Sequence, residues 1–384
     1  MIGRLLTLLR MEAHSVFTDK VIMLTVIGGV VLYSFLYPLP YSRQVPRDQH
    51  IAVVDQDNSS FSRQLIRWID ATPEVEVVTN LGSIEDAETM LSQRTISGFV
   101  VIRKDFRRDI LLGRPVSLAV AGDAAFFLVY GAVAEGAATV GGTLGATIKV
   151  GRLVVGGQEI KLASRQWTAF GLNARPVFNT TLGYVFYVVP AVFVLILQQT
   201  LLIGTGVLGG TQNALRRRGE RGYWLEFPAW QVLSVRILIF VAIYSVLALY
   251  YFGFCFRYYG IPRHADIADL VRLTLPFLLA VTTFGIVLGQ LVTRRDLATQ
   301  IVLLSSLPLV FTSGFVWPTH LVPWPLLFLA NLVPSTPAIQ AFLRLNQMGA
   351  TFDQILPLWE QLWIQTIVYG CLAWWLLRRA QKLG

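Results

Sequence analysis

The chain has 384 residues, of which 54% are hydrophobic and only 14% are charged, and its mean hydropathy is +0.57. This composition excludes an ordinary soluble domain, because so many apolar side chains exceed what a water-exposed surface tolerates. The net charge of +9 does not indicate nucleic-acid binding. The polar residues 41–180 are almost neutral, with 15 basic and 14 acidic residues, so the excess positive charge lies beside the apolar runs. The sequence also lacks a basic groove interleaved with stacking aromatic residues.

Six apolar runs are long enough, or nearly long enough, to cross a membrane. The first covers residues 21–37, and no small-residue cleavage site follows it, so we expect a retained helix and not a cleaved signal peptide. The other five cover residues 182–207, 232–254, 270–292, 297–316 and 362–377. A bilayer core about 30 Å thick needs about 20 apolar residues in a helix. The sequence therefore predicts a polytopic α-helical membrane protein with six transmembrane helices, the last five within residues 182–377.

Basic residues lie mostly on one side of these segments. With the N-terminus in the cytoplasm, 12 Lys and Arg residues flank the inner ends of the helices, and the short outer loops hold only Arg257, Arg263 and Arg344. Short loops rich in Lys and Arg stay in the cytoplasm. The sequence therefore predicts that both termini are cytoplasmic, with a short tail at residues 378–384.

The polar segment between the first two apolar runs has the pattern of a separate domain. Apolar runs typical of buried strands alternate with helical patterns, and they lie at residues 51–55, 75–78, 96–102 and 115–123. Asn58 or Ser59 can cap the first helix, and Ser83 begins the second with a capping-box-like pattern. We predict an inserted extracytoplasmic α/β domain at residues 41–175, with one or two long helices within residues 124–167.

Candidate catalytic and metal-binding residues are few. Asp55, Asp57 and Asp123 are of a type that binds divalent cations, but DQDNSS after a strand is more typical of a turn and a helix cap. The four histidines have no metal-ligand spacing, and Cys255 and Cys371 lie in or beside apolar runs. No P-loop sequence occurs. We therefore expect no metal site, no bound cofactor and no ATPase activity in this chain.

The apolar runs contain no Asp, Glu or His of the kind that relays protons in coupled transporters. Arg236 and Arg272 lie near the ends of their runs, where we expect them to extend toward the membrane surface. Uncharged polar side chains are frequent instead, and either they line a path for an amphipathic substrate or they form hydrogen bonds between helices. The candidate path residues are Gln198, Gln199, Thr200, Gln290, Gln300, Ser305 and Ser306.

Glycine residues cluster in two of the apolar runs. Residues 204–210 read GTGVLGG, and Gly285 and Gly289 lie about one helical turn apart. Small residues let helices approach closely in membranes. We interpret both clusters as packing sites between helices.

Two loops combine aromatic residues with features of a membrane surface. The loop at residues 214–230, ALRRRGERGYWLEFPAW, mixes basic and aromatic residues as an interfacial helix does, and it is equally suited to docking a soluble partner. On the outer side, prolines interrupt the apolar segment 318–345. Pieces this short cannot cross the membrane with their backbone groups satisfied. We predict an outer re-entrant segment, flanked by Trp317 and Trp324.

The order of these features resembles the permease subunit of type-2 ATP-binding-cassette (ABC) exporters, in the branch with a large extracytoplasmic domain after the first span. RMEAHSVFTDK resembles the amphipathic elbow helix of that family, here within residues 1–20, and IAVVDQDNSSFSRQL resembles its first extracytoplasmic strand and helix. ISGFVVIRKDFRRDILLG resembles the strand and helix that come later in that domain. TSGFVWPTHLVP resembles the turn after the fifth span, which places Gly314, Trp317, Pro318 and Pro323 at the outer re-entrant turn.

In that family the loop between the second and third spans inserts into a cleft of the ATPase through an acidic residue followed by Gly-Thr. Glu220 and Gly222 are the nearest match here, and Tyr223 replaces the Thr. The outer side also departs from the family, with Asn179 and Thr180 where many relatives have Asn-Pro. The resemblance implies an ATPase-coupling set of Arg216, Arg217, Arg218, Glu220, Arg221, Gly222 and Tyr223.

The resemblance also implies a function. It implies the membrane-spanning permease of an ATP-driven exporter for an amphipathic small molecule, drug or lipid, in the bacterial inner membrane. The implied partners are separate ABC ATPase subunits that bind ATP and magnesium, a second permease in a homodimer or heterodimer, a periplasmic adaptor protein and membrane lipid. The alternative class of function is a membrane-anchored extracytoplasmic ligand sensor or scaffold without transport activity.

Overall fold

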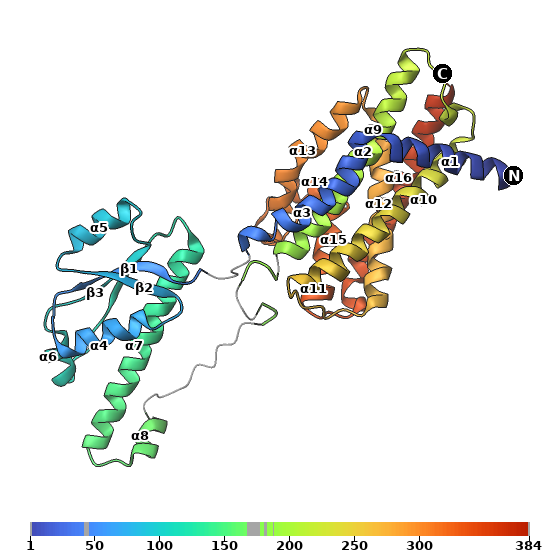
Figure 1. Ribbon diagram of the computed structural model, residues 1–384. Coiled ribbons are helices and arrows are strands. Elements are labelled where there is room, and N and C mark those ends of the chain that lie inside the picture. The colour runs from blue at the N-terminus through green and yellow to red at the C-terminus, as the bar shows by residue number, and fades with distance from the viewer. Residues whose placement is uncertain (1, 42–45, 167–176, 180–182, 187, 383–384) are drawn as a thin grey trace. The chain divides into compact units, whose positions relative to one another are not determined.

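The computed structural model describes residues 2–41, 46–166, 177–179, 183–186 and 188–382. The chain forms two compact units, one of residues 1–42 and 177–384 and the other of residues 43–176. Figure 1 shows the first as a bundle of helices and the second as a sheet with helices packed on it. We call them the helical unit and the α/β unit. Thr180 and the predicted boundaries at 175 and 182 lie outside the described residues.

The α/β unit contains a four-stranded sheet with the strand order β2-β1-β3-β4. β1 (Gln49–Asp55) pairs in parallel with β2 (Val75–Leu81) and β3 (Gly98–Ile102), and β4 (Ala119–Gly122) pairs antiparallel with β3. The two central strands, β1 and β3, are buried on both faces over the apolar runs that predicted them. The four predicted strands are confirmed.

Helices cover both faces of this sheet. One face packs against α4 (Ser60–Asp70), α6 (Phe106–Leu111) and α7 (Phe127–Val155), and the other packs against α5 (Ile84–Ser92). The short helix α8 (Ile160–Gln166) follows α7. The predicted α/β fold is confirmed, while its place outside the cytoplasm stays a prediction.

The long helix α7 is apolar enough to cross a membrane, yet here it packs on the sheet. Its buried side chains recur every three or four residues, namely Val133, Ala137, Val140 and Leu144. Sheet residues cover this stripe and supply the tertiary support that a glycine-rich helix needs. The predicted long helix is confirmed over residues 127–155.

The end of β1 is a turn and a helix cap. The Asp55 carboxylate accepts hydrogen bonds from the backbone N–H groups of Asp57 and Asn58, both at 3.0 Å, and from the Ser62 hydroxyl at 2.7 Å. Ser59 caps α4 with a complete capping box. These contacts confirm the turn-and-cap interpretation, and the described residues hold no cluster of three or more metal-ligating side chains.

The helical unit begins with α1 (Ile2–Thr18), which forms the predicted elbow helix. The first span follows as α2 (Lys20–Met23), the π-helix η1 (Leu24–Gly29) and α3 (Val30–Leu36), and ends in the 3₁₀ turn η2 (Leu39–Tyr41). Between them, the Asp19 carboxylate accepts hydrogen bonds from the first backbone N–H groups of α2. Asp19 therefore separates the elbow helix from the first span.

The rest of the helical unit is arranged around one central helix, α9 (Val188–Arg217). The helices after it are α10 (Ala229–Leu249), α11 (Phe256–Tyr258), α12 (Ile267–Leu291), α13 (Arg295–Thr312), α14 (Trp324–Asn331), α15 (Ser335–Phe342) and α16 (Phe352–Lys382). Shorter 3₁₀ and π-helical turns lie between them, namely η3 (Tyr223–Leu225), η4 (Tyr250–Cys255), η5 (Thr319–Leu321) and η6 (Leu343–Gln347). In the most apolar 18-residue stretch of α9, 94% of the residues are buried, whereas in that of the first span 28% are buried. The first span, α10, α12, α13 and α15 all contact α9.

Five described helices are long and apolar enough to cross a membrane, or six if the bent pair α14–α15 counts as one span. Four of them coincide with the first four predicted spans, and the fifth is α7. The last two predicted spans form α13 and α16, which do not meet the same test of apolarity. Charged Arg295 and Asp296 begin α13 and lower its mean hydropathy. That α13 and α16 cross the membrane stays a prediction.

Glycines let several neighbours approach α9 closely, as the sequence predicts. A Cβ atom added at three of these glycines would come too close to a different neighbour each time. At Gly204 it would lie 2.8 Å from Val26 of the first span, and at Gly206 it would lie 2.8 Å from Ala298 of α13. At Gly209 it would lie 2.7 Å from the backbone of Gly289 in α12. No side chain larger than hydrogen fits at these contacts without a shift of the neighbour. The α9–α12 contact is therefore made backbone against backbone.

Asn213 closes the same contact at the C-terminal ends of the two helices. Its Nδ2 atom donates to the carbonyl oxygens of Gly289, Gln290 and Val292 at 3.0, 3.1 and 2.9 Å. The last carbonyls of a helix have no partner within the helix. The side chain of one helix thus caps the end of its neighbour.

We predict that Gly209→Ala pushes α9 and α12 apart, because the new Cβ atom would lie 2.7 Å from the backbone of Gly289. Overpacking of this kind costs about 1–3 kcal/mol or more. The matched control is Gly370→Ala in α16, where a Cβ atom would meet Thr283 at an ordinary 3.7 Å. Melting temperatures in mild detergent check the prediction, and equal values for the two variants would contradict it.

Candidate functional site

The loop at residues 214–230 connects α9 to α10, at the end of the helical unit where both chain termini lie (Figure 1). Arg217, Arg218, Glu220 and Arg221 are exposed and form its tip. An interfacial helix is not formed here, because the chain turns at Gly219, whose φ is +77°, and then makes only η3 before α10 begins. The left-handed conformation at Gly219 is one that glycine adopts at little cost.

The C-terminal helix α16 holds the base of this loop. The Arg216 guanidinium donates to the Ala380 carbonyl at 3.0 Å. The Gln381 side chain donates to the carbonyls of Trp224 and Phe227 at 2.7 and 2.8 Å. The base is therefore fixed against α16, while the charged tip is free to contact another protein.

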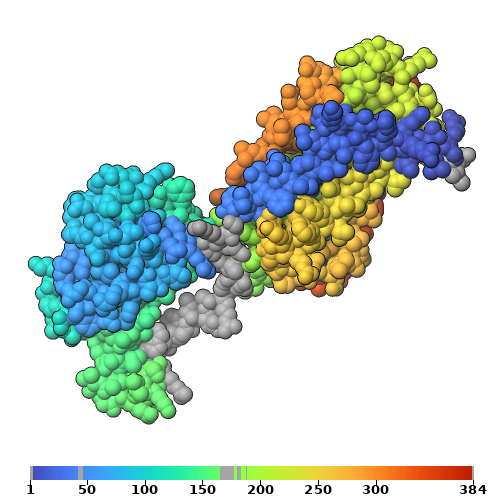
Figure 2. Space-filling model, in the orientation of Figure 1, coloured from blue at the N-terminus to red at the C-terminus, as the bar shows by residue number. Residues whose placement is uncertain are grey.

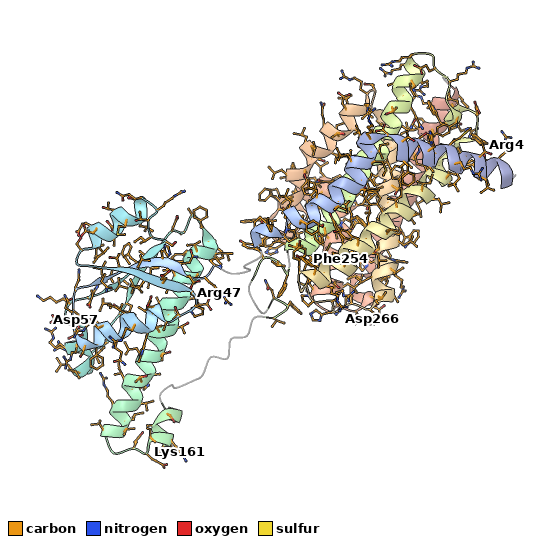
Figure 3. All side chains as sticks on the ribbon, in the orientation of Figure 1. Arg4, Arg47, Asp57, Lys161, Phe254 and Asp266 are labelled. Carbon is orange, nitrogen blue, oxygen red and sulfur yellow. The ribbon has the colours of Figure 1, made fainter. Side chains whose placement is uncertain are left out.

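The two ends of the helical unit differ in the residues that they carry. The Arg4 guanidinium lies over the Phe227 ring, 5.7 Å from its centre, at the end with the 214–230 loop. Phe254 and Asp266 lie at the opposite end (Figure 3). The predicted inner and outer loops thus lie at opposite ends of the helical unit, and which end faces the cytoplasm stays a prediction.

Arg236 does not extend to the membrane surface, so that prediction is wrong. Its side chain is fully buried, and its Nε atom donates to Oε1 of Glu12 in α1, which is also fully buried. The other oxygen of this carboxylate accepts a hydrogen bond from the Tyr223 hydroxyl. Burial, followed by the nearby Glu12 charge, raises the pKa of Tyr223, so its hydroxyl stays protonated and donates. Arg272, in contrast, is exposed and pairs with Asp269.

A cleft of about 650 Å³ lies between the first span, α9 and α13. Figure 2 shows the first span and α13 side by side on one face of the helical unit. Apolar side chains make up most of the lining, and the polar lining residues are Thr25, Tyr33, Tyr37, Gln199, Thr200, Thr299 and Ser306. Gln199 of α9 donates to Ser306 of α13 at 2.8 Å. Apolar walls with a few polar groups are typical of sites for amphipathic ligands.

Three of the predicted path residues line the cleft and four do not. Gln199, Thr200 and Ser306 line the cleft. Gln198 is buried on another face of α9 and donates to Ser335 of α15 at 2.9 Å. Residues next to each other in a helix point in different directions, so a run of polar residues does not by itself show which of them share a face. Three further residues do not line the cleft, namely Gln290, Gln300 and Ser305.

The helices α14 and α15 are bent by 90° against each other. Pro318 precedes η5, and Pro323 precedes α14. The turn before Pro318 requires a glycine at position 314. The φ of Gly314 is +90°, and a Cβ atom added there would lie 2.6 Å from Thr319. Trp317 is 53% exposed. This shape agrees with the predicted outer re-entrant segment, whose depth in a membrane stays a prediction.

The bend between α14 and α15 leaves backbone carbonyls without partners inside a helix. Side chains of α16 donate hydrogen bonds to these carbonyls instead. Gln361 and Gln365 both donate to the Asn331 carbonyl, at 2.9 and 2.7 Å. The Tyr369 hydroxyl donates to the Leu332 carbonyl. Broken helices are tolerated at membrane depth only where the protein satisfies their backbone in this way.

The family model described as ABC-2 family transporter protein matches residues 20–375. The chain belongs to the ABC-2 family. No curated protein matches the chain significantly. Membership in the ABC-2 family indicates a multi-pass membrane protein that is the permease subunit of an ABC transporter, and it implies ABC ATPase subunits as partners.

In this ABC-2 permease, we predict that Gln361→Leu and Gln365→Leu destabilise the protein only when they are combined. Either glutamine alone still satisfies the Asn331 carbonyl, whereas the double variant leaves this half-buried carbonyl without either of its glutamine donors. An unsatisfied buried polar group costs about 1–3 kcal/mol. Thermal unfolding of the two single variants and the double variant checks this. Strictly additive losses would contradict the prediction.

Proposed function

We propose that this ABC-2 permease is the membrane-spanning subunit of an ATP-driven exporter that moves an amphipathic molecule through the cleft between the first span, α9 and α13. The cleft carries the proposal, because it combines apolar walls with the polar groups of Gln199, Thr200 and Ser306. Such a lining suits a drug-like molecule or a lipid, which is mostly apolar and has one polar end. The export direction and the bacterial inner membrane follow from the resemblance to type-2 exporters.

The ATPase subunits are proposed to dock on the tip of the 214–230 loop. The tip offers exposed Arg217, Arg218 and Arg221 around Glu220, and its base is held by α16. A fixed base with an exposed charged tip suits force transfer, because a partner that moves the tip also moves the helices attached to it. No P-loop sequence is present, so ATP and magnesium are assigned to the partner.

A second permease, identical or similar, is proposed to cover the open side of the cleft. The rim on α13 exposes Leu303, Leu304 and Leu307, which are 59, 82 and 65% exposed. The rim on the first span exposes Leu24 and Leu32, which are 73 and 59% exposed. Apolar surface of this extent needs lipid or another apolar protein surface against it, and a second permease would enclose the path from both sides.

The α/β unit is proposed to lie outside the cytoplasm and to contact a periplasmic adaptor. Its place in the chain, between the first and second predicted spans, supports this, as does the positive-inside count. A membrane-anchored ligand sensor or scaffold is the alternative function. Copurification under mild detergent separates the two, because the exporter brings an ABC ATPase with it and the sensor does not.

We predict that Arg217→Gln with Arg218→Gln lowers the amount of ATPase that copurifies by about fivefold, since two exposed charge contacts contribute about 0.5 kcal/mol each. The matched control is Arg378→Gln with Arg379→Gln, which removes the same charge at the same end of the helical unit. Quantitative immunoblots of the purified complex provide the measurement. An equal loss in both double variants would show that net charge, and not the loop, matters.

We predict that Ser306→Trp abolishes binding of the amphipathic dye ethidium, because the indole fills the cleft and removes the bond to Gln199. Ser245→Trp is the control, since Ser245 is exposed on α10 and bonds only within its own helix. Fluorescence titration of the purified protein measures the affinity. Wild-type affinity in Ser306→Trp would place the binding site elsewhere.

A further inference from the structure

Four polar side chains from four different segments form a closed ring at the end of the helical unit that carries the 214–230 loop. They are Glu12 of α1, Gln212 of α9, Tyr223 of η3 and Arg236 of α10. Glu12 accepts from both Arg236 and Tyr223. Arg236 also donates to the Gln212 side-chain oxygen at 2.9 Å, and Gln212 donates in turn to the Tyr223 hydroxyl at 3.3 Å. We call this set the junction ring.

The two charged side chains of the junction ring are not an obvious way to stabilise the contact between these segments. Glu12 and Arg236 are both fully buried, and removing two charges from water costs free energy that their attraction returns only with good geometry. Apolar side chains of similar size often stabilise a core equally well or better. Charges at such a site can instead fix the positions of the segments that they join, because hydrogen bonds are directional and apolar contacts are not.

The segments joined by the junction ring lead from the loop tip to the cleft. Tyr223 follows the exposed tip of the loop, and Glu12 lies on α1. At its other end α1 reaches Asp19, which caps the start of the first span and pairs with Arg295 of α13 at 3.1 Å. The first span and α13 are two of the three walls of the cleft. A shift of Tyr223 that moves α1 therefore reaches both walls.

We propose that the junction ring is a rigid joint that couples movement of the 214–230 loop, through α1, to the first span and α13. Glu12 and Arg236 are then positioning residues that touch neither nucleotide nor substrate. The proposal rests on the proposed function, because it requires an ATPase that moves the loop. In this proposal α1 transmits movement from the 214–230 loop to the first span and α13.

The test follows the cleft directly and needs no known substrate. Leu303, which lines the cleft, is replaced by Cys and labelled with a bimane fluorophore in a Cys371→Ser background. Cys255 is buried and is left in place. The complex with the copurified ATPase receives ATP and vanadate, and the shift in bimane emission is recorded beside the rate of ATP hydrolysis.

Two variants separate a joint from a merely stabilising contact. Glu12→Gln removes the charge, and Glu12→Leu with Arg236→Met replaces the ion pair by apolar packing that keeps the protein folded. We expect both to lose most of the ATP-dependent emission shift, while ATP hydrolysis continues. Thr7→Ala, on the exposed side of α1, is the control and keeps the full shift.

The outcomes distinguish this proposal from the proposed function. A full emission shift in the folded Glu12→Leu/Arg236→Met variant overturns the joint and reduces the junction ring to a structural contact. The absence of any ATP-dependent shift with the ring intact also overturns it. Failure of an ATPase to copurify with the unmodified protein overturns the proposed function itself, and the joint with it.

Discussion

The close packing of neighbours around α9 is the constraint on which the helical unit depends. A helix that is covered on nearly all sides must meet each neighbour at short range, and its glycines allow this for the first span, α12 and α13. The polar groups of α9 follow the same arrangement, because Gln198, Gln199 and Asn213 bond to three different neighbours. At the cleft, the first span and α13 leave part of α9 uncovered.

Polar satisfaction explains how the ends of the helical unit are built. At one end, α16 donates to the carbonyls that the bend between α14 and α15 leaves free. At the other end, the same helix holds the 214–230 loop through Gln381. Thus α16 ties both the α14–α15 bend and the 214–230 loop to the bundle, while the loop tip and the cleft rims stay exposed. Rigid support beside an exposed loop suits the proposed docking of a separate ATPase.

The sequence predicted most of the elements and fewer of the contacts. Strands, caps and the first four spans follow from local patterns, the elbow helix follows from the family resemblance, and all of them formed where expected. The ion pair between Glu12 and Arg236 was missed, because the two residues lie 224 positions apart and hydropathy does not show which helices touch. Likewise, the polar run at Gln198 and Gln199 divides between two faces, which depends on how α9 is rotated against its neighbours.

The account assigns the route through the membrane to this chain and the supply of energy to a separate ATPase. Uptake of ethidium into vesicles tests that division most directly, with the permease reconstituted either alone or with its copurified ATPase and without any ion gradient. The account predicts ATP-dependent accumulation only when both proteins are present. Accumulation against a gradient by the permease alone, driven by protons or sodium, would contradict it.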